Sequence, residues 1–336
     1  MGWACSPGAT AKGIAPDVSD GCDPPVEDRD SGKGDAGGFM GGWYHFAWNG
    51  VKAETEVGGV SASVTPLREE ALSIRLRTGV QVGVLAGGRE SPAPPLVLLP
   101  GVGGAKELFY SLMEPLGRGR RVWAVDLSPR VGARESVIDS AVKDLQEVLV
   151  ALDLERCDLL GQSFGAVVAA RATRRDGSRV RRLVLASPAA APRGWLAPRM
   201  VFVSLATGGA IRVWPKSRSA SLRRCIESLG GYALEPTLGG EDFDALVARV
   251  RRVLVFPFFR RLVACAWHSW MAELEGIDKP VLILEGEREV PLLPPAVLSF
   301  FRSRPNTSFV VVPGGHMPFL TSPDRFASAV SQFLDP

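Results

Sequence analysis

Histidine and cysteine are scarce in this chain of 336 residues, which has three histidines and five cysteines. The cysteines, at positions 5, 22, 157, 225 and 265, are odd in number and scattered, so they do not suggest a disulfide framework. The sequence also lacks paired Cys or His spacings for a metal and the lysine pattern of a phosphate-binding loop. We therefore expect no metal or other cofactor, and a reducing cytoplasm as the location.

A strong charge of one sign is missing as well, because the formal net charge is only +3. Binding of nucleic acid requires many basic groups on one face of a protein. The arginines instead occur in small local clusters: Arg179, Arg181 and Arg182; Arg249, Arg251 and Arg252; and Arg260 and Arg261. We interpret these clusters as solvated helix faces in a chain with abundant acidic residues, and we expect no nucleic-acid partner.

Hydrophobic runs of membrane-spanning length are also lacking. The apolar segment from Met200 to Ile211 is too short to span a bilayer and contains two glycines. The start of the chain, Met1 to Gly42, is dense in glycine, aspartate and proline, and lacks the basic start and hydrophobic middle of a secretory signal. We expect no membrane span, and we expect residues 1–60 to be a disordered segment.

What the chain does have is enough apolar content for a large core, since 46% of its residues are hydrophobic. Residues 72–78 and 81–86 alternate like an antiparallel hairpin around Gly79. Strand-like and helix-like segments then alternate over residues 96–99, 107–116, 121–126, 136–152, 157–160, 164–174 and 182–186. This alternation predicts an α/β fold whose mostly parallel sheet is covered by helices on both faces.

The alternation is interrupted after Ser187 and resumes at Pro280. The span between them has helical periodicity and is rich in tryptophan, phenylalanine and arginine. We interpret residues 188–278 as a helical insertion over the carboxyl ends of the strands, and residues 70–187 and 279–336 as the two parts of the core. Its aromatic side chains suggest an uncharged or lipophilic ligand, although most of them would form the insertion's own small core.

Gly161-Gln162-Ser163-Phe164-Gly165 is a G-x-S-x-G sequence between a strand-like apolar run and a helix-favouring run. In this strand–turn–helix context a serine becomes a nucleophile. The glycines permit the sharp turn, and the first N–H groups of the helix point to where an oxyanion would form. An ordinary β–α turn is the alternative interpretation of the same residues.

A serine nucleophile needs a base with a pKa near neutrality to take its proton. His316 ends the sequence Gly314-Gly315-His316, a flexible loop that directly follows the strand-like residues 308–312, and it is the predicted base. His268 lies in an aromatic stretch that we expect to be helical, and His45 lies in the glycine-rich N-terminal region. We expect both of these histidines to be structural.

A third group must orient the imidazole of the base. The strand-like run from Pro280 to Leu284 ends in Glu285-Gly286-Glu287-Arg288-Glu289, a turn that carries three carboxylates. The order serine, carboxylate, histidine along the chain is the order found when the three residues follow successive strands of a hydrolase sheet. The residues alone leave open which of the three glutamates takes this role.

These features together resemble the α/β-hydrolase superfamily over roughly residues 70–335. The resemblance rests on a strand that ends in Asp126-Leu127, on the turn around Ser163, and on the loop from His316 to Leu320 with its closing helix. It implies that the acid is Glu289, three residues after Gly286. It also implies that the backbone N–H groups of Val102 and Phe164 form the oxyanion hole, and that residues 188–278 are the helical cap of the family.

The resemblance implies a serine hydrolase that needs no cofactor. Its substrate would be a carboxylic ester or related acyl bond of a small lipophilic molecule, cleaved through Ser163, His316 and Glu289. Acyltransferases and C–C bond hydrolases can use the same triad and are alternatives.

Two positions depart from the usual residues of the family. Glu289 stands where members usually carry aspartate, and Pro100 stands where they commonly carry histidine. Pro100 makes residues 95–104 similar to those of maspardin-like members, which implies a non-catalytic protein that keeps the fold and binds protein partners. Ser163 and His316 oppose this alternative, since a binding protein has no need for a strained turn aimed at a histidine.

Residues 96–126 also imitate a dinucleotide-binding unit, with a strand, a Gly101-x-Gly103 turn, a helix and a second strand that ends in Asp126. Lys106 stands at the third glycine position of that fingerprint, and Pro100 interrupts the turn. Because this interpretation leaves the loops of Ser163 and His316 unexplained, we do not predict a nucleotide cofactor.

Overall fold

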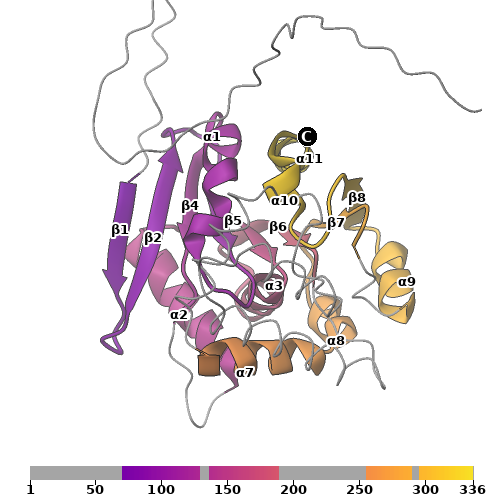
Figure 1. Cartoon of the computed structure of the whole chain (residues 1–336), viewed down its shortest axis with the longest axis horizontal. Helices are drawn as coiled ribbons and strands as arrows, with labels where there is room; N and C mark the ends of the chain where they lie inside the picture. The colour runs from indigo at the N-terminus through magenta and orange to yellow at the C-terminus, as the bar shows by residue number, and fades with distance from the viewer. Residues whose placement is uncertain (1–69, 129–135, 189–254, 290–294, 336) are drawn as a thin grey trace, which may run out of the picture. The chain divides into compact units, whose positions relative to one another are not determined.

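The computed structural model describes residues 70–128, 136–188, 255–289 and 295–335. Within these ranges the chain forms an eight-stranded sheet (Figure 1). Its strands are β1 (Glu70–Arg75), β2 (Gln81–Gly88), β3 (Leu96–Leu99), β4 (Arg121–Val125), β5 (Cys157–Gln162), β6 (Val180–Ala186), β7 (Val281–Gly286) and β8 (Thr307–Val312).

The order of the strands in the sheet is β1-β2-β4-β3-β5-β6-β7-β8. β1 and β2 form the predicted antiparallel hairpin, and β2 also runs antiparallel to β4. All the other neighbouring pairs are parallel, which confirms the predicted fold class. Strands β3 to β8 therefore end at the same edge of the sheet, where ligands bind in open α/β sheets.

Helices cover both faces of this sheet (Figure 1). One face carries α1 (Tyr110–Gly117), preceded by the short 3-10 helix η1 (Lys106–Phe109), together with α10 (Pro318–Thr321) and α11 (Pro323–Leu334). The other face carries α2 (Val137–Ala151), α3 (Phe164–Arg175), α7 (Val255–Ala266), α8 (Trp270–Glu275) and α9 (Pro295–Ser303).

The two apolar layers of the core follow from the alternation of side chains along the buried strands. Leu183 and Leu185 of β6 pack in the layer that includes α2 and α3, whereas Val184 and Ala186 pack in the layer that includes α1 and α11. Because both faces of these strands are buried, their sequences are continuous apolar runs. That is why the sequence pattern predicts them.

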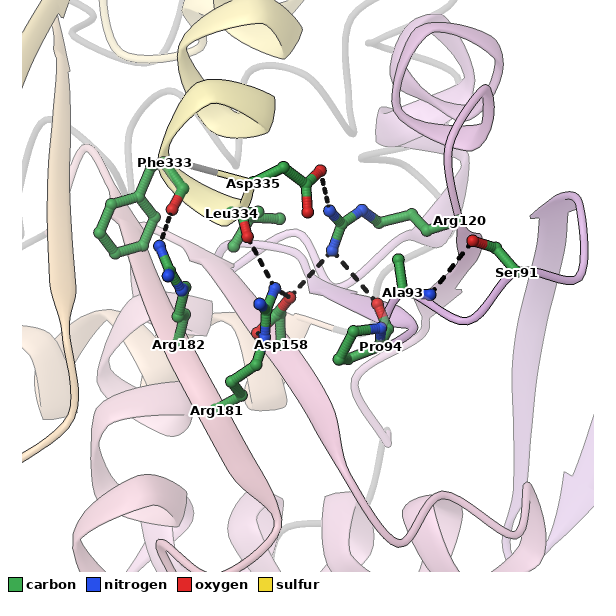
Figure 2. Close-up of polar contacts among 10 residues, drawn as sticks. All are labelled: Ser91, Ala93, Pro94, Arg120, Asp158, Arg181, Arg182, Phe333, Leu334 and Asp335. Carbon is green, nitrogen blue, oxygen red and sulfur yellow. Dashed lines mark hydrogen bonds and ion pairs between the residues drawn. The ribbon is translucent and has the colours of Figure 1, made fainter.

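One charged residue lies inside this sheet, near the start of β5. Asp158 is fully buried, and its carboxylate accepts hydrogen bonds from Arg120 at 2.9 Å and from Arg181 at 2.9 and 2.6 Å. Figure 2 shows that the two arginines also reach the end of α11, where Arg181 donates to the Leu334 carbonyl and Arg120 pairs with Asp335. The Asp158 network therefore ties β5 to the last helix.

The interpretation of the arginine clusters as solvated helix faces is wrong for two of them. Arg181 and Arg182 lie on a strand, and each donates to a backbone carbonyl at the end of α11. Arg261 lies on helix α7 but is only 3% exposed. The spacing of arginines in the sequence does not show which of them bind carboxylates or backbone carbonyls of distant segments. The third cluster, Arg249 to Arg252, lies outside the described residues.

Two predictions about domain organisation fall largely outside the described residues. They are the disordered segment 1–60 and most of the helical insertion 188–278. The described end of the insertion forms α7 and α8 and is thus helical. Of the helices within the described ranges, none has the length and apolar character needed to cross a membrane.

Candidate active site

Ser163 lies at the sharp turn between β5 and α3, at the carboxyl edge of the sheet. Its backbone angles, φ 53° and ψ −114°, fall in a region that residues with side chains rarely adopt. Its N–H donates to the Ala186 carbonyl of β6 at 3.0 Å, which fixes the turn to the neighbouring strand. This strained geometry places a serine hydroxyl above the edge of the sheet.

The two glycines of the G-x-S-x-G sequence are required by close backbone contacts. A Cβ atom on Gly161 would lie 2.2 Å from the carbonyl oxygen of Gly165. A Cβ atom on Gly165 would lie 2.2 Å from the carbonyl oxygen of Leu99. The start of α3 is therefore packed directly against the ends of β3 and β5, and a larger residue at either position would displace Ser163.

The loop that follows β3 lies against Ser163. A Cβ atom on Gly101 would lie 3.1 Å from Cβ of Ser163. The Gly101 carbonyl accepts a hydrogen bond from the Gly104 N–H at 2.9 Å. Because a trans peptide group is planar, the Val102 N–H points to the opposite side from that carbonyl. The Phe164 N–H is the first of α3 and has no acceptor within the helix. Of the two residues predicted to donate to the oxyanion, Phe164 follows Ser163 in the chain and Val102 follows Gly101, which lies against Ser163.

The turn after β7 and the loop after β8 are bound to each other through their backbones. The Glu287 N–H donates to the Val312 carbonyl at 2.8 Å. A Cβ atom on Gly286 would lie 2.1 Å from the carbonyl oxygen of Gly315, so only glycine fits there. These contacts bring the carboxylate-bearing turn next to the histidine loop.

Glu289 and His316 face each other across this contact, with Oε1 of Glu289 2.7 Å from Nδ1 of His316. Their side chains are largely shielded, at 7% and 16% exposed. When Nδ1 carries the proton, His316 donates to the carboxylate and Nε2 is able to accept a proton. Gln162 donates through Nε2 to the His316 backbone carbonyl at 3.2 Å, which holds the histidine loop beside the nucleophile turn.

The other two glutamates of the turn differ from Glu289 in their surroundings. Glu287 is exposed to solvent. Glu285 is half-buried, and its pKa is raised by burial and then by repulsion from Glu289, against a smaller opposing effect of Arg302. Among the described residues, Glu289 is the carboxylate that contacts His316.

His268 is not part of this group of residues. It lies in the break between α7 and α8 rather than inside a helix as expected, and its side chain is 2% exposed. Its ring packs edge-on against Trp270, with centroids 4.9 Å apart. Burial, helped by the charge of Arg171, lowers the pKa of His268 to about 4. The remaining histidine, His45, lies outside the described residues.

Sequence reasoning missed Arg261, which the structure places beside the loop of Val102. Its Nη1 donates to the Val102 carbonyl at 3.2 Å, and its Nη2 donates to the Ser128 carbonyl at 2.6 Å. Its guanidinium carbon lies 6.0 Å from the centroid of the Phe164 ring, within range of a cation–π contact. Because the two carbonyl partners are more than 100 positions away in the sequence, no local pattern indicates them.

Ser187 is a second residue that sequence reasoning missed. It follows β6 at the same edge of the sheet, with φ at 44°. It is 1% exposed, and its Oγ has no hydrogen-bond partner among the described residues. A strained residue with an unpaired buried hydroxyl at this edge is typical of the surroundings of a functional site.

The groups at this edge suit nucleophilic acyl transfer. They comprise a serine on a strained turn, a histidine oriented by a carboxylate, and backbone N–H donors beside the serine. Among residues 70–128, 136–188, 255–289 and 295–335, no three His, Cys, Asp or Glu side chains are grouped so that they could hold a metal ion.

A mostly parallel sheet with a serine on the strand–helix turn after β5, and an acid and a histidine after its last two strands, defines the α/β-hydrolase class of protein. The model of the alpha/beta hydrolase family matches residues 96–329. The chain belongs to this family, and the resemblance found in the sequence is confirmed.

Individual relatives are similar to different extents. The chain is 25% identical over 257 residues to a poly(3-hydroxyalkanoate) depolymerase of Ectopseudomonas oleovorans, a match that covers 71% of this chain and 84% of the relative. It is 28% identical over 270 residues to polyketide synthase ThaQ of Burkholderia thailandensis, a match that covers 78% of this chain but only 12% of ThaQ.

A solved structure, carboxylesterase CesB of Bacillus subtilis, is similar with a TM-score of 0.62 at 23% identity, over 80% of this chain and 93% of that one. That likeness shows the shared fold. Together with the family match, the relatives support a hydrolase.

Proposed function

We propose that this chain is a serine hydrolase that cleaves a carboxylic ester or related acyl bond of a small lipophilic substrate through Ser163, His316 and Glu289. One observation carries the proposal, namely the 2.7 Å contact between Glu289 and Nδ1 of His316 in a loop that Gln162 holds beside the serine turn. Burying a carboxylate lowers the stability of the fold unless the carboxylate is paired. The strained backbone at the serine turn lowers the stability as well. Catalysis supplies a reason for keeping both.

In the first half of the reaction, Nε2 of His316 accepts the hydroxyl proton of Ser163 as Oγ attacks the acyl carbon. The N–H groups of Phe164 and Val102 stabilise the oxyanion of the tetrahedral intermediate, aided by the positive end of the α3 dipole. His316 then gives the proton to the leaving alcohol, and the acyl group remains on Ser163. Glu289 keeps the imidazole in the required tautomer and stabilises the imidazolium.

In the second half, His316 removes a proton from water, which attacks the acyl carbon of the covalent intermediate. Collapse of the second oxyanion releases the carboxylic acid, and the proton on His316 returns to Ser163. An acyltransferase would bind an alcohol in place of this water, and a C–C bond hydrolase would release a carbon leaving group. The depolymerase relative, matched over 84% of its length, favours transfer to water.

The experiment that tests the proposal is intact-mass labelling with a fluorophosphonate probe, which reacts with activated serines. Three forms of the full chain are compared: wild type, Ser163→Ala and Ser187→Ala. Ser187 is a matched control, since it is a buried serine at the same edge of the sheet with a positive φ. We expect one adduct on the wild type and on Ser187→Ala, none on Ser163→Ala, and a loss of esterase activity of at least about 10³-fold in Ser163→Ala.

Two results would contradict the proposal. An adduct or esterase activity that persists in Ser163→Ala would show that another residue is the nucleophile. A folded wild type that forms no adduct would favour the non-catalytic, partner-binding alternative.

A further inference from the structure

Three segments of the chain meet at the guanidinium group of Arg261. Its Nη1 donates to the carbonyl of Val102 in the loop after β3. Its Nη2 donates to the carbonyls of Leu127 and Ser128, in the segment after β4, at 3.3 and 2.6 Å. Arg261 itself belongs to α7, which precedes β7. This side chain therefore joins a helix to two loops at the carboxyl edge of the sheet.

The position of Arg261 is costly in free energy. The residue is 3% exposed, and its guanidinium group donates to three backbone carbonyls. Burial lowers the pKa of Arg261 to about 10, although Asp144 opposes the shift, so the group is still charged at neutral pH. Backbone carbonyls of the two loops compensate this charge, and an apolar residue of similar length would avoid the desolvation cost.

The loop after β3 is shaped around this guanidinium. Gly104 has φ at 64°, and a Cβ atom on it would lie 2.5 Å from Nη1 of Arg261. The backbone angle favours glycine at this position, and a side chain there would displace the guanidinium group.

Both peptide groups that flank Val102 are held by hydrogen bonds. The group on its N-terminal side is held through the Gly101 carbonyl, which accepts from Gly104. The group on its C-terminal side is held through the Val102 carbonyl, which accepts from Arg261. The Val102 N–H belongs to the first of these planar groups, so the Gly101 carbonyl sets its direction. The bond from Arg261 holds the second group and so limits rotation of the backbone at Val102.

The far end of the same loop has its own supports. The Leu127 N–H donates to the Gly104 carbonyl at 3.1 Å, and Asp126 accepts from the Lys106 N–H at 2.8 Å. These contacts hold residues 104–106 without touching Val102. The bond from Arg261 acts on the carbonyl of Val102 itself.

We propose that Arg261 is a positioning residue that holds the backbone at Val102, so that its N–H keeps the orientation needed to stabilise the oxyanion, and that it links this donor to α7. The inference rests on the proposed function. A donor that binds the oxyanion acts in the transition state more than in the bound ester. Loss of its orientation should lower kcat and leave KM nearly unchanged.

The test compares wild type with Arg261→Met, Arg261→Lys and Cys265→Ala, using p-nitrophenyl butyrate and the full chain. Cys265 is the matched control because it is buried on the same helix, at 4% exposed, and packs in the core under α3. We expect Arg261→Met to lower kcat by about 10- to 100-fold with KM within about twofold of wild type. Arg261→Lys should be intermediate, because it keeps the charge but lacks the rigid planar fork with which arginine reaches the carbonyls of both loops.

A second measurement separates positioning from general destabilisation. A trifluoromethyl ketone that forms a tetrahedral adduct with the serine mimics the transition state, so its inhibition constant should rise in parallel with the fall in kcat/KM. Melting temperatures of all four forms show how much protein is folded. The inference is overturned if the inhibition constant is unchanged in Arg261→Met, or if Cys265→Ala with the same loss of melting temperature loses the same activity.

Labelling by the fluorophosphonate probe distinguishes failure of this inference from failure of the proposed function. If the wild type is not labelled, both the proposed function and this inference are contradicted. If the wild type is labelled at Ser163 and Arg261→Met is labelled at the same rate, only the inference about Arg261 is contradicted. The labelling rate constant also serves as the readout if the wild type does not turn over the butyrate ester, because phosphonylation loads negative charge on the same donors.

Discussion

The conformation of Ser163 depends on residues around it that have no side chain. A non-glycine residue at φ 53° is strained by roughly 1–3 kcal/mol. The strain persists because β5 is buried along its whole length and α3 is buried over most of its first turns. Gly161 and Gly165 let the start of α3 pack closely against the ends of β5 and β3, and Gly101 lets the loop after β3 approach Ser163. The position of the hydroxyl is thus set by packing of the core rather than by its own hydrogen bonds.

The identity of the acid can be tested at the residue scale. Glu289→Gln should lower kcat by at least about 100-fold, because an amide cannot stabilise the imidazolium and can favour the wrong tautomer of His316. Glu285→Gln and Glu287→Gln are matched controls on the same turn and should have much smaller effects. Steady-state kinetics on one ester, at equal folded fraction, gives the comparison. Equal losses in all three variants would refute the role of Glu289.

Residues of the candidate site differ in how far the sequence indicates them. The G-x-S-x-G sequence is local, and its glycine spacing alone predicts the turn at Ser163. His316 follows from the scarcity of histidine and from its place after a strand. Among three equivalent carboxylates, Glu289 required the resemblance to a family. Arg261 had no signal at all, because its neighbours at Val102 and Ser128 come close only when the sheet is formed.

His268, a titratable residue between α7 and α8, is buried, so the stability of the fold should depend on pH. The side chain of His268 is 2% exposed, and its pKa is lowered from 6.5 to about 4 by burial and then by Arg171. In the unfolded chain the ring binds a proton at higher pH than in the folded one. The stabilising effect of the neutral ring is therefore fully present above about pH 6.5 and is lost as pH falls toward about 4.

His268→Phe should remove this pH dependence while keeping an aromatic ring against Trp270. Between about pH 7.5 and pH 5, the free energy of unfolding of the wild type should fall by about 2 kcal/mol more than that of the variant. Urea unfolding followed by tryptophan fluorescence at both pH values measures the difference. Parallel pH profiles would show that His268 titrates alike in the folded and unfolded chains.

Helices and strands were predicted well where a local sequence pattern sets their bounds. They were predicted less well where a contact with a distant residue sets those bounds. The strands of the core agree closely, because apolar runs that are buried on both faces are easy to read. The helix expected over residues 107–116 instead starts as η1 and continues as α1. Asp126 binds the Lys106 N–H at 2.8 Å, a contact across 20 residues that fixes the entry to this helix and that no periodicity reveals.

At the scale of the whole described core, the two ends of β5 have different tasks. Ser163 follows its carboxyl end, whereas Asp158 near its start gathers Arg120, Arg181 and the end of α11 (Figure 2). The network joins segments that are up to 215 positions apart in the chain. From the sequence alone, residues 157–160 are predicted only to be an apolar strand. The network is not predicted, because the partners of Asp158 are distant along the chain. The buried ion-pair network thus lies at one edge of the sheet and the candidate chemistry at the other.

This separation predicts that Asp158→Asn destabilises the fold without impairing the site. The change leaves the buried guanidinium of Arg120, 2% exposed, and that of Arg181 without their shared negative charge, which should cost about 3–5 kcal/mol. Asp335→Asn is the matched control: it removes a carboxylate from the same Arg120, but that side chain is 54% exposed, so the cost should be at most about 1 kcal/mol.

Urea unfolding of both variants measures the two costs, and esterase kinetics at a temperature where each is folded measures the site. We expect a large loss of stability in Asp158→Asn alone, with kcat close to that of the wild type in both variants. Equal losses of stability would mean that the buried pairing with Asp158 contributes no more than an exposed ion pair. A fall of kcat in folded Asp158→Asn would mean that the two edges of the sheet are coupled through β5, since this strand alone carries both Asp158 and the turn of Ser163.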